Sequence, residues 1–147
     1  MSLNHYSITI NAPFNNSCER IKEPSFWLTF LPGFDQLTSI SESIYLIDLY
    51  LSLGPVSRKA LLTFKFKPET KMTDVLFTFS SSNKSVSGLG QLTISQYSEN
   101  AIQLKVSLDL QLKGKKSLLL TPLLPSVKES WAKNILNQVK FSLENEQ

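Results

Sequence analysis

The stretch that decides the fold is residues 101–113, which read AIQLKVSLDLQLK. Apolar side chains occupy every second position from Ile102 to Leu112, and polar ones such as Gln103 and Lys105 fill the positions between them. Side chains alternate between the two faces of a β-strand, so this pattern predicts a long strand with one buried face and one solvated face.

The same alternation recurs upstream, which predicts a whole sheet. Each further segment has an apolar row at every second position: Tyr6–Ile10, Tyr45–Leu53, Ala60–Phe66, Thr73–Phe79 and Gly88–Ile94. Short breaks separate these segments at Gly54-Pro55, Pro68-Glu69-Thr70 and Ser98-Glu99-Asn100. Consecutive strands joined by short turns form antiparallel meanders, so we predict a curved antiparallel sheet of about seven strands.

The end of the chain predicts a long helix that covers the apolar face of the sheet. Apolar residues recur at helical spacing over Val127–Leu143. Ser126, followed three residues later by Glu129, forms a capping-box pattern. We therefore expect the helix to span residues 126–143.

Two shorter helices are expected after the first strand, at residues 13–21 and 24–31. Each begins at a proline, which suits the first turn of a helix, and Leu31-Pro32-Gly33 ends the second. The order is thus one strand, two short helices, the remaining strands and a long C-terminal helix. This is an α+β arrangement of the helix-grip type, in which a curved antiparallel sheet wraps around a terminal helix.

Composition and charge exclude several kinds of site. The chain has 147 residues with one His and one Cys, so we expect one domain over residues 1–147. These counts exclude a Cys/His zinc site and an internal disulfide, and we expect no cofactor. The net charge of +3 is too small to indicate nucleic-acid binding. The lysines at 113, 115 and 116 form either a solvated turn or a contact for an anionic headgroup or acidic partner.

No membrane-spanning or exported segment is expected. A membrane span needs about 20 mostly apolar residues, and the apolar stretches here are shorter or interrupted by charges. The N-terminal MSLNHYSITINAP lacks a basic region ahead of an apolar one, so it does not predict a signal peptide. We predict a cytoplasmic location.

Several short motifs resemble a known superfamily. Ile10-Asn11-Ala12-Pro13 resembles the turn that ends the first strand of START-like (SRPBCC) proteins. Leu31-Pro32-Gly33, the stretch LSLGPV at residues 51–56 and Leu112-Lys113-Gly114 then follow in an order and spacing that resemble the G-subunit family of carbon monoxide dehydrogenase. The resemblance covers essentially the whole chain. It implies an apolar cavity between sheet and helix that accepts lipophilic molecules, and an association with a molybdenum hydroxylase. Other superfamily members are lipid carriers, hormone receptors or aromatase/cyclase enzymes, and fold alone does not choose among them.

The inward rows supply the candidate lining of this cavity. Large aromatic residues on two neighbouring rows face the helix that carries Trp131, which suits an apolar pocket with few polar anchors. The candidate cavity residues are Leu49, Leu51, Phe64, Phe66, Phe77, Phe79, Gly88, Val106, Leu108, Trp131 and Ile135. We expect a mainly apolar void beneath Trp131 and Ile135, with plain core packing as the alternative. Gly88 and Gly90 either leave room beneath the helix or ease strand bending.

Three aromatic residues flank Pro32-Gly33 at the expected cavity mouth, namely Trp27, Phe30 and Phe34. They either pack into the core or form a hydrophobic lip, in which case peripheral contact with a membrane is expected.

The polar candidates favour binding over catalysis. We predict a non-enzymatic carrier of a lipophilic ligand, and an accessory role beside an oxidoreductase subunit is compatible with it. The alternative is a polyketide cyclase/aromatase-like or hydrolase-like enzyme, for which Tyr45, Asp48 and Ser52 are the accessible candidates. His5 is expected at the surface, and Cys18 is expected as a small buried residue.

Overall fold

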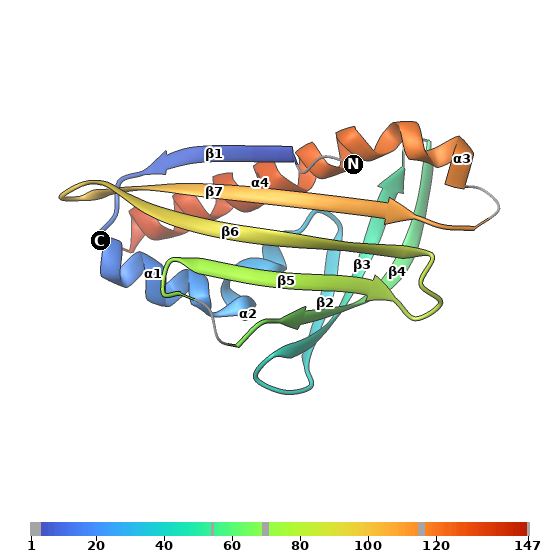
Figure 1. The fold of residues 1–147 in the computed structure, drawn as a ribbon, viewed down its shortest axis with the longest axis horizontal. Coiled ribbons are helices and arrows are strands. Elements are labelled where there is room, and N and C mark those ends of the chain that lie inside the picture. Colours follow the sequence, from blue (N-terminus) through green and yellow to red (C-terminus); the bar gives the residue numbers. More distant parts are fainter. Residues whose placement is uncertain (1–3, 54, 69–70, 115–116, 147) are drawn as a thin grey trace.

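A computed structural model describes residues 4–53, 55–68, 71–114 and 117–146, and it shows a curved sheet around a long helix (Figure 1). The strands are β1 (Asn4–Ile10), β2 (Phe34–Ser39), β3 (Ile44–Leu53), β4 (Val56–Phe66), β5 (Asp74–Ser81), β6 (Val86–Ser98) and β7 (Ala101–Leu112). The helices are α1 (Phe14–Lys22), α2 (Pro24–Trp27), α3 (Ser117–Leu120) and α4 (Leu124–Asn145), with 3-10 turns η1 (Leu28–Phe30) and η2 (Thr121–Leu123).

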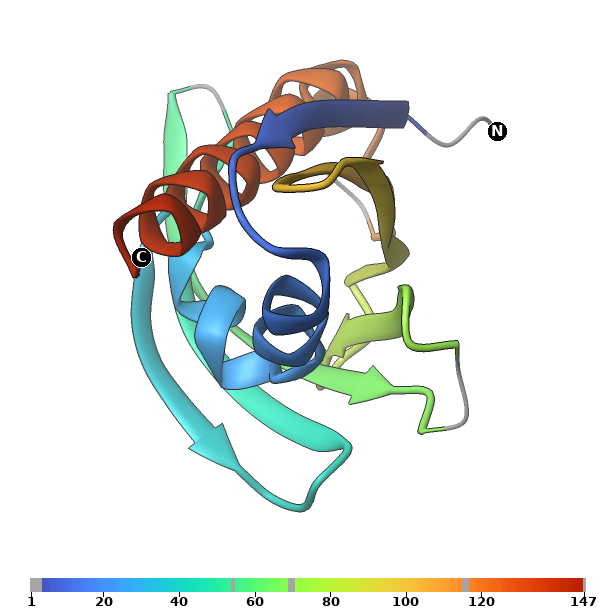
Figure 2. The ribbon, with the colours of Figure 1, turned by 90° about the vertical axis from the view of Figure 1, so that its left-hand side faces the viewer.

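The seven strands form one antiparallel sheet in the order β1-β7-β6-β5-β4-β3-β2. The predicted meander is therefore confirmed from β2 to β7. The first strand pairs with the last, with Tyr6 opposite Val106. Viewed from the end, the sheet curves around α4 and the two short helices, which lie on its concave side (Figure 2).

The alternating rows place the core on the concave side of the sheet. On β3, Tyr45, Ile47, Leu49 and Leu51 are all buried. Leu61, which breaks the polar row of β4, lies on the convex face and is 46% exposed. α4 packs its apolar side against β1 and β7. Within the described residues, no helix is long and apolar enough to cross a membrane.

The C-terminal helix begins at Leu124, and the predicted cap at Ser126 is wrong. The N-cap residue is Leu123, which has helical dihedral angles (φ −87°, ψ −13°) and makes no side-chain cap hydrogen bond. An N-cap residue normally has extended dihedral angles. Here the chain already turns through η2, and Pro125 occupies the first turn of α4, so Ser126 lies inside the helix.

The second short helix is only partly α-helical. It is α-helical over Pro24–Trp27 and then tightens into η1, which ends before Pro32-Gly33 as predicted. Gly33 has a positive φ of 75°, and the Tyr50 N–H donates to its carbonyl oxygen at 2.9 Å. A Cβ at this position would lie 2.2 Å from the Tyr50 carbonyl oxygen, so only glycine fits this turn against β3.

Some predicted features fall partly outside the described residues. These are the turns at Gly54-Pro55 and Pro68-Glu69-Thr70 and the lysine cluster, of which positions 54, 69, 70, 115 and 116 are not described. The break at Ser98-Glu99-Asn100 is confirmed, because β6 ends at Ser98 and β7 begins at Ala101.

The end of α4 holds the turn that follows β1. The Asn11 backbone N–H donates to Glu144 Oε2 at 2.9 Å, and Lys140 Nζ donates to the same oxygen at 2.6 Å. Lys140 Nζ also donates to the Thr9 carbonyl oxygen at 3.1 Å. The Asn11 N–H, followed by Lys140, lowers the pKa of the Glu144 carboxyl group.

This contact makes stability depend on pH in a predictable direction. The pKa of Glu144 is lower in the folded protein than in the unfolded chain. The stabilisation is therefore present above the unfolded-state pKa and is lost as the pH falls through the folded-state pKa. We expect Glu144→Gln to reduce the free energy of unfolding by ~0.5 kcal/mol at neutral pH and to have no effect in acid. Urea denaturation at both pH values measures this, with Glu99→Gln, at an exposed position in the turn between β6 and β7, as the control. An equal loss at both pH values would contradict the assignment.

Candidate functional site

The structure brings the predicted cavity residues together between the sheet and α4. Most of them are at most 5% exposed, namely Leu49, Leu51, Phe64, Phe77, Phe79, Val106, Leu108, Trp131 and Ile135. Phe66 and Gly88 are half-buried. The interior at this position is thus lined by apolar side chains, as the alternation predicts.

Aromatic rings form a continuous series across this interior. The Phe66 ring centroid lies 5.8 Å from that of Trp27, which lies 5.3 Å from Phe77. Phe77 and Phe79 are 6.3 Å apart, and Phe79 lies 5.6 Å from Trp131 on α4. These spacings are typical of rings in direct contact. We call this series, from Phe66 to Trp131, the aromatic row.

The glycines of β6 accommodate two of these rings. Gly90 pairs with Phe77 and Gly88 pairs with Phe79 across β5 and β6. A Cβ on Gly90 would lie 2.3 Å from Phe77 Cζ, and one on Gly88 would lie 2.5 Å from Phe79 Cζ. The space beside each glycine is therefore filled by a phenyl ring of the neighbouring strand. The void expected beneath Trp131 and Ile135 stays a prediction.

The three expected mouth residues differ in how far they are buried. Trp27 is fully buried, and its indole Nε1–H donates to the Ile21 carbonyl oxygen at 3.1 Å. Phe30 and Phe34 are half-buried. Trp27 therefore belongs to the core, and of the two interpretations of its ring the structure favours packing.

A cleft opens beside Phe66 instead, between the short helices and the ends of β4 and β5. It has a volume of about 280 Å³, and its lining comes from four separate segments: Lys22, Pro24, Glu42, Ser43, Phe66, Lys67, Pro68 and Val75. Phe66 is thus both a wall of the cleft and the first ring of the aromatic row. Sequence patterns do not reveal this cleft, because its residues are dispersed along the chain and half of them lie in turns.

The cleft carries charged groups around an apolar wall. Lys22 Nζ donates to the Asp74 carbonyl oxygen at 2.7 Å. Burial lowers the pKa of Lys22, while the nearby Asp74 and Cys18 groups oppose this effect. Cys18 is buried, as predicted, and burial raises the pKa of its thiol. A buried thiol with a raised pKa is a poor nucleophile.

The three catalytic candidates do not form a group. Tyr45 lies on the inner face, with its ring 5.8 Å from that of Phe66, whereas Asp48 is half-buried and Ser52 is exposed on the other phase of β3. Burial raises the pKa of Tyr45, and the Glu23 and Glu42 charges add to this effect. The phenol therefore stays protonated at neutral pH and is not poised as a base.

The remaining polar candidates are structural. His5 is exposed, and its Nδ1 hydrogen-bonds Ser107 Oγ at 2.7 Å across β1 and β7. In the part of the chain that the structure describes, no three His, Cys, Asp or Glu side chains are grouped as metal ligands.

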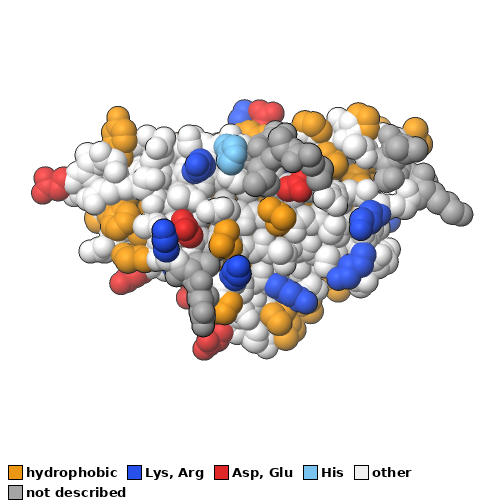
Figure 3. All heavy atoms as spheres, viewed as in Figure 1, with side chains coloured by type: hydrophobic (Ala, Val, Ile, Leu, Met, Phe, Trp, Pro, Cys, Tyr) orange, Lys and Arg blue, Asp and Glu red, His pale blue; other side chains and the backbone are white. Residues whose placement is uncertain are grey.

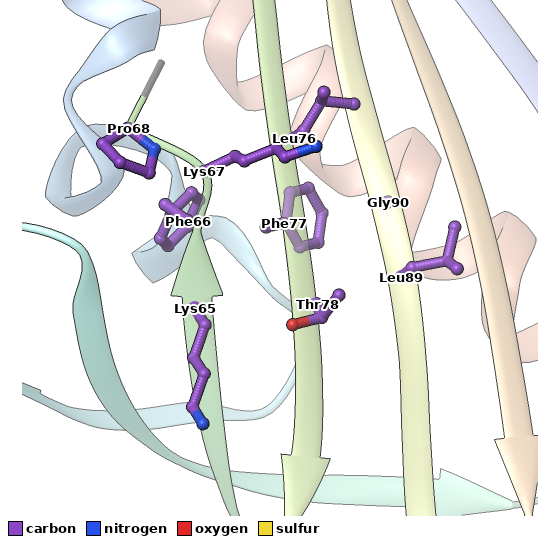
Figure 4. Close-up of a pocket in the computed structure, with 9 residues that line it drawn as sticks. All are labelled: Lys65, Phe66, Lys67, Pro68, Leu76, Phe77, Thr78, Leu89 and Gly90. Atoms are coloured by element: carbon purple, nitrogen blue, oxygen red, sulfur yellow. The ribbon is translucent and has the colours of Figure 1, made fainter. Parts of the chain in front are cut away.

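A second pocket lies on the convex face of the sheet, over β4, β5 and β6 (Figure 4). Its volume is about 460 Å³, and its lining consists of Lys65, Phe66, Lys67, Pro68, Leu76, Phe77, Thr78, Leu89 and Gly90. We call it the outer pocket. Its lysines and leucines belong to the outward rows of their strands, whereas Phe66 and Phe77 belong to the aromatic row.

Comparison with known proteins identifies the fold. No known family's sequence profile matches this chain, and no curated protein matches it. Among solved structures, a conserved protein from Geobacillus kaustophilus superposes with a TM-score of 0.78 at 15% identity, covering 97% of this chain and 95% of that one.

Two further solved structures superpose on most of this chain. The Zhui aromatase/cyclase from Streptomyces sp. R1128 has a TM-score of 0.74 at 12% identity, with coverages of 99% and 94%. A START superfamily protein from Mycobacterium smegmatis has a TM-score of 0.69 at 11% identity, with coverages of 93% and 96%. At such identities the likeness concerns the fold alone. This chain therefore has the START-like, helix-grip fold.

Proposed function

We propose that this protein binds a lipophilic small molecule between the sheet and α4 and releases it unchanged. The observation that carries the proposal is the aromatic row, which links the cleft at Phe66 to Trp131 on the covering helix. Apolar, aromatic-lined sites with few polar groups are typical of small-molecule binding. The solved structures with this fold are consistent with a ligand-binding role.

The cleft is the proposed route into the interior. Phe66 is half-buried, while the rings behind it are buried, so it is the mobile member of the row in this proposal. Because the rings pack against one another, a ligand enters by displacing Phe66 and takes over its contacts with Trp27 and Phe77. The ligand's apolar body then lies along the row, and any polar end remains near Lys22 and Ser43 in the cleft.

Closing the cleft is expected to prevent uptake. Ser43 lines the cleft, whereas Ser41 is exposed in the same turn and is not among the lining residues. We expect Ser43→Trp to weaken binding of the neutral fluorophore N-phenyl-1-naphthylamine by about tenfold, which corresponds to 1.4 kcal/mol. Ser41→Trp is expected to bind it like the original protein. Equal binding by both variants would contradict the proposed route.

The natural ligand is sought in the purified protein itself. Native mass spectrometry should show an added mass that disappears after extraction with organic solvent. Protein that is consistently empty and binds no apolar probe would overturn the proposal. A cytoplasmic location belongs to the same proposal, and the free thiol of Cys18 is compatible with it.

A second candidate is an accessory role beside a molybdenum hydroxylase. It is supported by the order of the Ile10–Pro13, Pro32-Gly33 and Gly114 motifs, which resembles that of the G-subunit family of carbon monoxide dehydrogenase. Affinity capture from the native cell tests it, since a hydroxylase subunit should co-purify with the tagged protein. The enzymatic alternative depends on Tyr45, which alone among the three candidate side chains lies on the inner face.

A further inference from the structure

The outer pocket has a charged side and an apolar side. Lys65 and Lys67 project from β4 and its end, Leu76 and Thr78 lie on β5, and Leu89 lies on β6 (Figure 4). Thr78 pairs with Lys65 on one side and with Leu89 on the other. In Figure 4 the Lys67 side chain extends toward Leu76, whereas the Lys65 side chain extends along β4, away from Lys67.

The apolar side is unusual for the solvated face of an antiparallel sheet, where polar side chains are expected. Leu89 is 44% exposed, and Leu76 is half-buried beside it. The two leucines are diagonal neighbours, because Leu89 pairs with Thr78, two residues from Leu76. Diagonal neighbours on one face are close enough for long side chains to touch. Both leucines therefore lie on the same outward face of the sheet.

The described lining of the outer pocket includes two cationic side chains, Lys65 and Lys67. No Asp or Glu is among the described residues that line the outer pocket. Neither lysine forms a salt bridge with another residue that the structure describes. Lys and Arg side chains are spread over both halves of the face shown in Figure 3, with acidic side chains between them. Asp109 lines an adjoining hollow, and Glu42 lines the cleft that Lys67 shares, so both carboxylates lie outside the lining of the outer pocket.

We propose that the outer pocket binds a small amphiphile with an oxyanion head, either carboxylate or phosphate. The head contacts the Lys67 ammonium group, with Lys65 as the second cation of the pocket, and the apolar chain lies along Leu76 and Leu89. A pocket of about 460 Å³ is the size of a small-molecule site. The outer pocket borders the interior site, because Phe66 and Phe77 line it and Phe66, Lys67 and Pro68 also line the cleft, but this proposal does not depend on the proposed function.

Titration of the ¹⁵N-labelled protein followed by NMR tests the proposal. The probe is octanoate, with acetate as the head alone and octan-1-ol as the chain alone. Octanoate should shift the amide signals of Lys65, Leu76, Thr78 and Leu89, which line the outer pocket but neither the cleft nor the aromatic row, and acetate should not. Octyl phosphate, titrated in the same way, shows which oxyanion binds more tightly. Shifts confined to the cleft and α4 would overturn this proposal while supporting the interior site.

Paired variants distinguish the contribution of the lysines to binding from that of the leucines. Lys65→Gln with Lys67→Gln should weaken octanoate binding by at least about threefold, since each exposed ion pair contributes modestly, and should leave octan-1-ol unaffected. The control variant combines Lys59→Gln with Lys105→Gln, on the same face outside the pocket, and it should bind octanoate and octan-1-ol as the original protein does. Leu89→Ser should weaken both octanoate and octan-1-ol, and its exposure keeps the fold intact. Equal octanoate affinity in the two lysine variants would overturn the proposal. So would binding to phosphatidylglycerol vesicles without binding of monomeric octanoate.

Discussion

Replacing Gly88 with alanine is expected to lower the free energy of unfolding by about 3 kcal/mol. The new Cβ would lie 2.2 Å from the Asp109 carbonyl oxygen and 2.5 Å from Phe79 Cζ. The ring can move, but the carbonyl belongs to the backbone of β7, which pairs with β6 along its length. Relieving the clash with this carbonyl oxygen therefore requires β6 and β7 to separate locally. Urea denaturation followed by far-UV circular dichroism measures the loss.

Gly90 provides the matched comparison. A Cβ there would meet side-chain atoms, with Phe77 Cζ at 2.3 Å and Leu108 Cδ2 at 2.9 Å. We expect Gly90→Ala to be less destabilising than Gly88→Ala, at about 1–2 kcal/mol. Combining Gly90→Ala with Phe77→Leu should recover part of this loss, because the second change removes the clashing ring atom. Combining Gly88→Ala with Phe79→Leu should recover much less. The opposite order of losses would contradict the described packing of β6.

The second large effect is expected at Trp27. Its side chain is fully buried and contacts the rings of Phe66 and Phe77 at 5.8 and 5.3 Å. Trp27→Ala removes these contacts and leaves the Ile21 carbonyl oxygen without the indole N–H. Removing a large buried aromatic side chain costs about 3–5 kcal/mol, and we expect a value near the middle of that range.

Two control variants test whether the burial of the Trp27 ring causes this loss of stability. Trp27→Phe keeps most of the ring volume and should lose less stability than Trp27→Ala. Phe30→Ala, at a half-buried position close to Trp27 in the chain, should also lose less. A loss below about 1 kcal/mol for Trp27→Ala would mean that the ring is not in the core. The hydrophobic lip predicted from the sequence would then regain support.

Alternating patterns made most of the sheet predictable. The apolar row of residues 101–112 determines both the strand and its buried face, because a shift by one residue would expose Ile102 and bury Lys105. β2 has no such signal. Within β2, Phe34 and Leu37 are half-buried and the other residues are exposed. These two residues lie three positions apart, and the pairing with β3 is irregular between Phe34 and Gln36, so buried and exposed positions do not alternate along this strand.

Helix boundaries and the site depended on contacts that the sequence does not show. Ser126 matches a cap pattern, but the preceding 3-10 turn has already established helical geometry. The aromatic row could be predicted from β4 and β5, since Phe66 and Phe77 lie on inward rows. The position of Trp27 could not, because its burial is set by the docking of α2 rather than by a repeating pattern.

The pairing of the first strand with the last has a consequence for how the chain folds. In the described sheet β1 lies at an edge and pairs with β7, and the partners of its residues lie about a hundred positions further along the chain, as for Tyr6 and Val106. During synthesis, β1 is therefore without this partner until β7 has left the ribosome, and α4, which packs against both, follows later still. Such distant pairings slow folding, since the intervening chain must be ordered before they form. The meander from β2 to β7 consists of strands that are neighbours in the chain, so it is the part of the sheet best placed to form early, before β1 pairs with β7 and α4 packs against both.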